Sequence, residues 1–225
     1  MIPAQEYWDR KYSERPHVDA NAPSAFLVRM LPRMAMGKVL DIAMGEGANA
    51  VCLAKQGFKV KGFDISGVAV EHAQRLAKEA GVTIEAQRAD LDFFLLGLME
   101  YDSIVMTYFR PSVVRYYSEM IRALKQGGTL LVESYMDQEM TEPLGREDAF
   151  KNFYFGVNEL LRNLAGLHIL FYHEGVDNGR HVVQCLAQRP LDKDAAKYNL
   201  FGMHTETKDA PISKQLELAE KFFKK

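Results

Sequence analysis

The fold class is decided by one stretch, Val39-Leu40-Asp41-Ile42-Ala43-Met44-Gly45-Glu46-Gly47-Ala48-Asn49-Ala50. Its first part is a short apolar run, typical of a buried strand, and its second part opens an amphipathic helix. Glycines lie at the junction, where the absence of a Cβ lets the backbone approach a ligand closely. The sequence therefore predicts a ligand site at this turn.

Strand and helix patterns alternate outward from this stretch. Strands are predicted over 38–42, 59–64, 82–87, 103–106 and 129–135, and helices over 46–56, 66–80 and 111–124. Ser66 is a suitable N-cap for the second helix, and Gly127-Gly128 is expected to turn the chain into the fifth strand. Alternation of this kind indicates a doubly wound, mostly parallel α/β sheet of the Rossmann-like type, with helices on both faces.

The last predicted strands differ from the others in their connection. After a helix near 157–164, strands over 168–173 and 181–188 flank Asp177-Asn178-Gly179, a turn typical of a β-hairpin. The last strand is therefore expected to be antiparallel. We expect one domain over 1–225, with an N-terminal helical segment (1–36), the Rossmann-like core (37–189) and a C-terminal extension (190–225).

Composition limits the partners. The 28 basic and 30 acidic residues nearly cancel, which disfavours nucleic acid as a ligand and suits a small molecule. No long apolar run predicts a membrane span, and Cys52 and Cys185 form neither a disulfide framework nor a zinc-ligand spacing. We expect a cytoplasmic protein without a metal.

The predicted helix over 212–223 has an apolar stripe, which we expect to pack either on its own domain or on a second copy of the chain. A monomer and a homodimer therefore both stay open.

Three carboxylates follow the first three predicted strands, and they indicate the ligand. Asp64 is placed to accept hydrogen bonds from both ribose hydroxyls of an adenosine, and Asp90 from the adenine amino group. Asp41 would repel the pyrophosphate of a dinucleotide, whereas it would attract the cationic methionine end of S-adenosylmethionine. Each Asp taken alone is better explained as a helix cap. Together with the glycine turn they favour S-adenosylmethionine.

Several motifs make a family resemblance specific. They are Tyr7-Trp8-Asp9-Arg10-Lys11-Tyr12, Pro23-Ser24-Ala25-Phe26-Leu27, the Asp41 turn with Asn49, Phe63-Asp64-Ile65-Ser66, Ala89-Asp90-Leu91 and Ala123-Leu124-Lys125-Gln126-Gly127-Gly128. With these, residues 5–189 resemble the class I S-adenosylmethionine-dependent methyltransferases, and most closely the tellurite-resistance and thiopurine-methyltransferase-like group. The resemblance implies a seven-stranded sheet with a reversed last strand, and an N-terminal lid over the cofactor. Ordinary docking of a helix on the core explains Trp8 and Tyr12 equally well.

The resemblance and the residue patterns together give a candidate site. Cofactor contacts are expected at Trp8, Tyr12, Asp41, Ala43, Gly45, Gly47, Asn49, Asp64, Ile65, Asp90, Leu91 and Thr107. Acceptor contacts are expected at Tyr108, Phe109, Arg110 and Tyr135, with Arg110 either steering an anionic acceptor or solvated at the surface. The expected reaction is direct SN2 methyl transfer to a small molecule, which releases S-adenosylhomocysteine. No residue is singled out as a catalytic base.

Two departures from the family pattern bear on this expectation. Ala43 replaces the family's first loop glycine, and Ala48 a basic residue. If φ at Ala43 is negative, the methyl group only tunes packing, whereas a positive φ would strain the turn and count against cofactor binding there. Two other functions stay open: an NAD-dependent oxidoreductase, suggested by the Gly45-x-Gly47-x-x-Ala50 spacing, and a non-catalytic module that binds S-adenosylmethionine.

Overall fold

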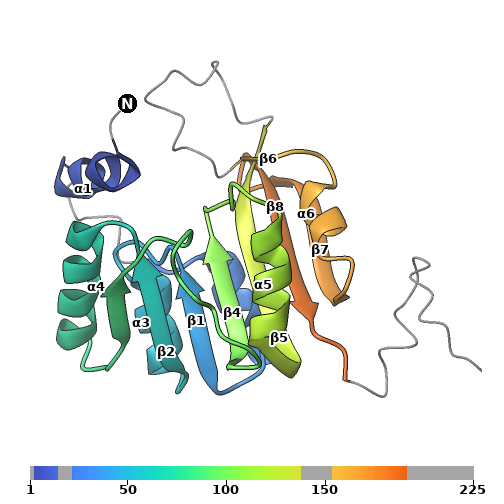
Figure 1. Cartoon of the computed structure of the whole chain (residues 1–225), viewed down its shortest axis with the longest axis horizontal. Helices are drawn as coiled ribbons and strands as arrows, with labels where there is room; N and C mark the ends of the chain where they lie inside the picture. Colours follow the sequence, from blue (N-terminus) through green and yellow to red (C-terminus); the bar gives the residue numbers. More distant parts are fainter. Residues whose placement is uncertain (1–2, 15–21, 138–153, 192–225) are drawn as a thin grey trace, which may run out of the picture.

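The computed structural model describes residues 3–14, 22–137 and 154–191 (Figure 1). These residues form a mixed β-sheet with helices packed on both faces. The strand order is β3-β2-β1-β4-β5-β8-β7, and a short β6 pairs with β5 off this path. The order turns back between β1 and β4, and open α/β sheets bind ligands beside the carboxyl ends of the strands at such a point.

The helices and strands have the following bounds. The strands are β1 (Lys38–Ile42), β2 (Lys59–Asp64), β3 (Glu85–Arg88), β4 (Tyr101–Thr107), β5 (Leu124–Met136), β6 (Tyr154–Phe155), β7 (His168–Asp177) and β8 (Arg180–Gln188). The helices are α1 (Ala4–Glu14), α2 (Ala25–Met30), the 3₁₀ helix η1 (Leu31–Arg33), α3 (Ala48–Lys55), α4 (Gly67–Glu79), α5 (Arg115–Ala123) and α6 (Glu159–Asn163).

The predicted sheet topology is confirmed. Strands β1 to β5 pair in parallel, and β8 runs antiparallel to both β5 and β7. Asn178 and Gly179 connect β7 to β8 with φ of 50° and 77°, the positive values that a two-residue type I′ hairpin requires. The short β6, whose two residues pair with the end of β5, was not predicted.

Several predicted boundaries were wrong, each for a local reason. Gly127 and Gly128 lie inside β5 rather than before it, in an irregular stretch between the Tyr101/Leu124 and Ser103/Thr129 pairs. A Cβ on Gly128 would come within 2.9 Å of the Asp102 carbonyl oxygen, so close backbone contact, not a turn, requires this glycine. Helix α3 begins at residue 48 rather than 46, and α5 at 115 rather than 111. The helix predicted over 212–223 lies outside the described residues.

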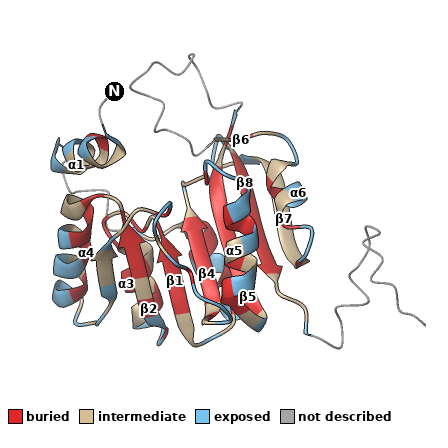
Figure 2. Ribbon diagram, viewed as in Figure 1, coloured by how far each residue is buried: buried red, intermediate tan, exposed pale blue. Residues whose placement is uncertain are grey.

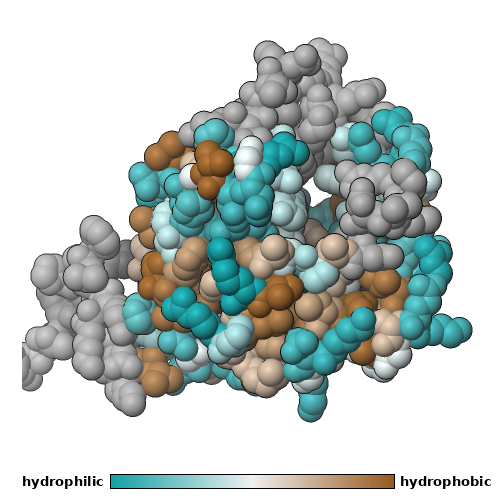
Figure 3. Space-filling view, turned by 180° about the vertical axis from the view of Figure 1, so that it is seen from behind, coloured by the Kyte–Doolittle hydropathy of each residue, from teal (hydrophilic) through white to brown (hydrophobic). Residues whose placement is uncertain are grey.

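The two faces of the sheet carry separate cores, as the alternation along β4 shows. Val105 packs with α2 and α3, whereas Ile104 and Met106 pack with α5 and α6. The central strands are accordingly buried along most of their length (Figure 2). On the outer surface seen from behind, polar and apolar groups are intermixed in small patches, as on an ordinary solvent-facing surface (Figure 3).

One crossover departs from the strand-helix alternation. Residues 89–100, between β3 and β4, contain no helix, and Leu91 and Leu96 are buried under the sheet face that α5 also covers. No helix in the described part of the chain has the length and apolar character needed to cross a lipid bilayer.

Candidate functional site

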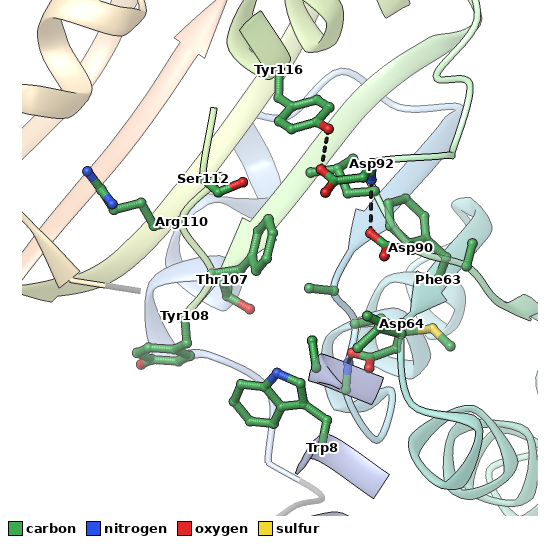
Figure 4. Close-up of a pocket in the computed structure, with 18 of the residues that line it drawn as sticks. Trp8, Phe63, Asp64, Asp90, Asp92, Thr107, Tyr108, Arg110, Ser112 and Tyr116 are labelled. Carbon is green, nitrogen blue, oxygen red and sulfur yellow. Dashed lines mark hydrogen bonds between the residues drawn. The ribbon is translucent and has the colours of Figure 1, made fainter. Parts of the chain in front are cut away.

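A cavity of about 680 Å³ opens at the carboxyl ends of the central strands, and side chains of α1 line its other side (Figure 4). Its walls come from α1, the turn after β1, the ends of β2, β4 and β5, the segment after β3 and the start of α5. They include Trp8, Tyr12, Ala43, Met44, Gly45, Phe63, Asp64, Ile65, Asp90, Leu91, Asp92, Thr107, Tyr108, Phe109, Arg110, Ser112, Tyr116 and Tyr135. The predicted ligand turn therefore does border a cavity.

The turn after β1 runs through three residues with left-handed backbone. Gly45 and Gly47 have φ of 54° and 84°, and Ala43 has φ of 53°. Ala43 thus adopts the conformation that was expected to strain it, because its Cβ crowds the following carbonyl oxygen. Gly47 also allows close helix packing, since a Cβ there would lie 2.6 Å from the Cβ of Ala73 in α4.

Asp64, at the end of β2, is held in a fixed orientation. Its Oδ2 accepts a 2.9 Å hydrogen bond from the Gly45 amide, and its Oδ1 accepts one of 2.9 Å from the Ser66 amide. The residue is only 5% exposed, and burial raises its pKa to about 6 although these amides oppose the rise. The Ile65 amide also interacts with this carboxylate, which has about four acceptor positions and so keeps acceptor capacity beside the cavity.

Asp41 lies deeper in the fold. It is fully buried in β1, does not border the cavity, and neither carboxylate oxygen has a hydrogen-bond partner within the described residues. Burial, with a smaller contribution from Asp64, raises the pKa of Asp41 to about 8. Near neutral pH, and without a bound cation, this carboxyl group is therefore largely protonated.

Asn49 does not border the cavity. Its side chain forms hydrogen bonds with two other segments, which it links to the ligand turn. Its Oδ1 accepts a 2.8 Å hydrogen bond from the Ser24 amide, and its Nδ2 donates one of 2.9 Å to Oγ1 of Thr107. Thr107, at the end of β4, does line the cavity. Asn49 therefore contacts a residue that lines the cavity but does not line the cavity itself.

A second acidic group follows Asp90. Oδ1 of Asp90 accepts a 2.9 Å hydrogen bond from the backbone amide of Asp92, and the Tyr116 hydroxyl of α5 donates to Oδ1 of Asp92. Figure 4 shows both contacts at the edge of the cavity. Sequence reasoning identified Asp90 and missed Asp92 and Tyr116, because only the fold brings α5 to the segment after β3.

The far end of the cavity is aromatic. The rings of Tyr108 and Tyr135 have their centroids 4.9 Å apart, and Tyr108 adopts a left-handed φ of 52°. The Tyr108 hydroxyl donates a hydrogen bond to Glu133, a buried residue of β5 that also accepts from Ser24 and Gln184. Burial and this contact raise the pKa of Tyr108, so the phenol stays neutral. Nothing in the sequence singled out Glu133.

Arg110 borders the cavity but is already paired. Its Nε lies 2.6 Å from Oε1 of Glu159 in α6, and its guanidinium lies 5.9 Å from the ring centroid of Phe155. A carboxylate partner partly neutralises the charge that would attract an anionic acceptor.

Most of the sequence-predicted residues lie together. Those that border the cavity are Trp8, Tyr12, Ala43, Gly45, Asp64, Ile65, Asp90, Leu91, Thr107, Tyr108, Phe109, Arg110 and Tyr135, whereas Asp41, Gly47 and Asn49 do not. Of the residues not predicted, Met44 and Phe63 stand beside predicted ones in the sequence, but Ser112 carried no signal.

Comparison with known proteins agrees with this geometry. Residues 39–128 match a family model described as a methyltransferase domain. The chain is 33% identical to the ribosomal protein L11 methyltransferase of Dictyoglomus thermophilum over 104 residues, which are 45% of this chain and 34% of that protein. The chain spans between about a third and three fifths of the length of the first curated relatives it matches.

Solved structures share the fold. A structure reported with the conversion of a disulfide bond into a thioacetal group during echinomycin biosynthesis aligns with a TM-score of 0.66 at 22% identity, covering 87% of this chain and 97% of that one. TehB from Haemophilus influenzae aligns with a TM-score of 0.62 at 21% identity, covering 84% and 68%. Residues 39–128 are therefore similar to a methyltransferase domain, in a chain that shares the mixed α/β fold of these solved structures.

Proposed function

We propose that this chain binds S-adenosylmethionine in the cavity, transfers its methyl group to a small-molecule acceptor and releases S-adenosylhomocysteine. The observation that carries the proposal is the geometry of Asp64. Its carboxylate is buried beside the cavity, oriented by the amides of Gly45 and Ser66, and retains acceptor capacity. A ribose with two adjacent hydroxyl donors matches this arrangement.

The other residues around Asp64 fit the same ligand. Asp90 would accept from an adenine amino group, and Ile65 and Leu91 would pack on the adenine ring. The backbone of the glycine turn would contact the methionine end. A side chain on Gly45 would narrow the space for the ligand there, because its Cβ would lie 3.0 Å from the Tyr12 hydroxyl. Asp41 lies behind this turn, where a cationic ligand would favour its ionised form.

When bound, S-adenosylmethionine supplies an electrophilic methyl group. The chain's contribution is to align the acceptor and to exclude water, effects that supply up to ~7 to 11 kcal/mol for well-oriented reactants. Tyr108 and Phe109 follow β4, and Tyr135 lies near the end of β5, where aromatic walls would shield the reacting atoms. An acceptor that has already lost its proton to solvent, such as a thiolate, a selenolate or an unprotonated amine, needs no dedicated base.

A small acceptor is favoured by the cavity. Trp8 and Tyr12 of α1 border it opposite the strand ends, and its walls close around about 680 Å³, a volume typical of small-molecule sites. A protein acceptor is the second candidate, because one relative is named as a ribosomal protein methyltransferase. The tellurite-resistance and thiopurine-methyltransferase-like assignment stays part of the proposal.

Calorimetric titration of the full chain with S-adenosylmethionine, S-adenosylhomocysteine and NADH tests the cofactor. We expect both sulfur ligands to bind and NADH not to bind, whereas binding of NADH alone would overturn the proposal in favour of an oxidoreductase. Transfer of labelled methyl groups to a panel of thiols, selenite, tellurite and ribosomal protein then separates the small-molecule acceptor from the protein acceptor. Cofactor binding without turnover on any of them would favour a non-catalytic module.

A further inference from the structure

Helix α1 buries Tyr7 against the rest of the fold and also contacts α4 through one acidic side chain. Asp9, in the middle of α1, points its carboxylate at the first turn of α4, where Oδ1 accepts a 2.6 Å hydrogen bond from the Ser66 hydroxyl. The Val68 amide donates to the same oxygen at 3.4 Å. Oδ2 accepts a 3.2 Å hydrogen bond from Gln5 within α1, so Asp9 itself is held in place.

This contact is stronger than an ordinary surface hydrogen bond. Helix α4 has 13 residues, and the unpaired amides of its first turn carry a partial positive charge that a carboxylate stabilises. Burial raises the pKa of Asp9, but the hydrogen bonds from Ser66, Gln5 and α4 outweigh it and lower the pKa overall. The Asp9 carboxylate therefore stays ionised at neutral pH.

Ser66 joins this contact to the proposed ribose carboxylate. Its hydroxyl donates to Asp9, and its backbone amide donates at 2.9 Å to Oδ1 of Asp64. One residue at the start of α4 thus orients both the α1 anchor and the side chain that we assign to the ribose.

The cavity wall depends on where α1 sits. Trp8 and Tyr12, one helical turn apart, both line the cavity, and their ring centroids are 6.0 Å apart. The Tyr12 hydroxyl lies so close to Gly45 that a Cβ there would be 3.0 Å from it. Figure 4 shows Trp8 on the opposite side of the cavity from Thr107 and Asp90.

We infer that Asp9 is a positioning residue for the cofactor site: by binding Ser66 and the first turn of α4, it holds α1 so that Trp8 and Tyr12 form one wall of the cavity. The inference rests on the proposed function for the identity of the ligand. It does not place Asp9 in contact with that ligand. Loss of the Asp9 carboxylate should therefore release the α1 wall while leaving Asp64 and the glycine turn intact.

The chain offers an internal probe, because Trp8 is its one tryptophan. The fluorescence emission of the full chain therefore reports the surroundings of α1, with or without ligand. The test compares the wild-type chain with Asp9→Asn and with Glu6→Gln. Glu6 is an exposed acidic residue of α1, so its variant matches the change in charge and in helix composition.

For Asp9→Asn we expect a red-shifted Trp8 emission without ligand, because the indole becomes more exposed to water. We also expect S-adenosylhomocysteine to bind about tenfold more weakly, as one charge-assisted contact is lost. Stopped-flow fluorescence should assign the loss to faster dissociation, since a displaced wall no longer retains the ligand. Glu6→Gln should match the wild type in all three measurements.

Two results would overturn the inference. Either an unchanged Trp8 emission in a folded Asp9→Asn chain, or a shifted emission with unchanged affinity, would show that Asp9 does not position the site. A wild-type chain that binds no S-adenosylhomocysteine would refute the proposed function instead. In that case the ligand-free emission of Asp9→Asn still decides whether Asp9 holds α1.

Discussion

The backbone amide of Gly45 donates a 2.9 Å hydrogen bond to Oδ2 of Asp64, which joins the turn after β1 to the end of β2. Two motifs separated in the sequence thereby become one site, because parallel neighbouring strands end at the same edge of the sheet. The Asp64 carboxylate also depends on this amide for its ionisation. Burial alone would raise its pKa further than the value of about 6.

The affinity for S-adenosylhomocysteine should therefore depend on pH. Ribose hydroxyls donate to the ionised carboxylate, so binding should weaken as pH falls below the Asp64 pKa of about 6, by up to ~10-fold per pH unit. Calorimetric titrations from pH 5 to 8 measure this profile. Asp64→Ala should bind weakly and should not lose further affinity between pH 7 and 5. A wild-type affinity that does not change between pH 7 and 5 would contradict the assignment.

Ala43→Gly should stabilise the fold. Ala43 has φ of 53°, a conformation that costs a residue with a Cβ ~1 to 2 kcal/mol and costs glycine almost nothing. The greater entropy of glycine in the unfolded chain offsets part of this gain. We therefore expect a net increase in the free energy of unfolding of ~1 kcal/mol. Urea denaturation of the variant measures it. A loss of stability would mean that the Ala43 methyl contributes more by packing than its backbone strain costs.

Asp41→Asn should change how stability depends on pH. The folded pKa of about 8 lies above the ordinary value of 3.8, so the native chain binds more protons than the unfolded chain between these limits. Ionising Asp41 therefore lowers stability as pH rises through this window, and asparagine removes the effect. Between pH 6 and 8, the wild-type free energy of unfolding should fall more steeply than that of Asp41→Asn, by up to ~1.4 kcal/mol per pH unit. Parallel profiles would place the titration elsewhere.

Asn49→Ala should affect stability more than cofactor binding. Asn49 does not border the cavity, and its amide group bonds Ser24 and Thr107 instead. Loss of both bonds should lower the free energy of unfolding by ~1 to 3 kcal/mol. The affinity for S-adenosylhomocysteine should fall by less than it does in Asp64→Ala. An affinity loss as large as that of Asp64→Ala would indicate that Asn49 contacts the ligand directly.

Local patterns were sufficient to predict most strands of the sheet and their directions. The strand at 38–42, the glycine turn and the Asn178-Gly179 hairpin each carry a signal with a backbone cause, and each has the predicted form. The predicted ends of helices and strands were wrong where contacts with distant segments determine them. Gly128 is required by the Asp102 carbonyl across the sheet, a partner that the neighbouring residues do not reveal.

The candidate site could likewise be predicted only in part. Residues that follow strand ends, such as Asp64 and Asp90, could be placed because the fold class places them. Glu133 could not, since it contacts the site through Tyr108. Tyr116 could not either, since only the fold brings α5 to the cavity and to Asp92. The sign of φ at Ala43 was likewise beyond the sequence, because alanine itself prefers a negative value.

The central claim is that S-adenosylmethionine binds against Asp64, and calorimetric titration of Asp64→Ala at pH 7.5 tests it most directly. Ser112→Ala serves as the control, since Ser112 borders the same cavity beyond Arg110 and has no assigned cofactor contact. We predict that Asp64→Ala binds S-adenosylmethionine more weakly by ~1.5 to 3 kcal/mol, through loss of a charged acceptor for two hydroxyls, while Ser112→Ala binds like the wild type. Unchanged affinity in a folded Asp64→Ala chain would contradict the account.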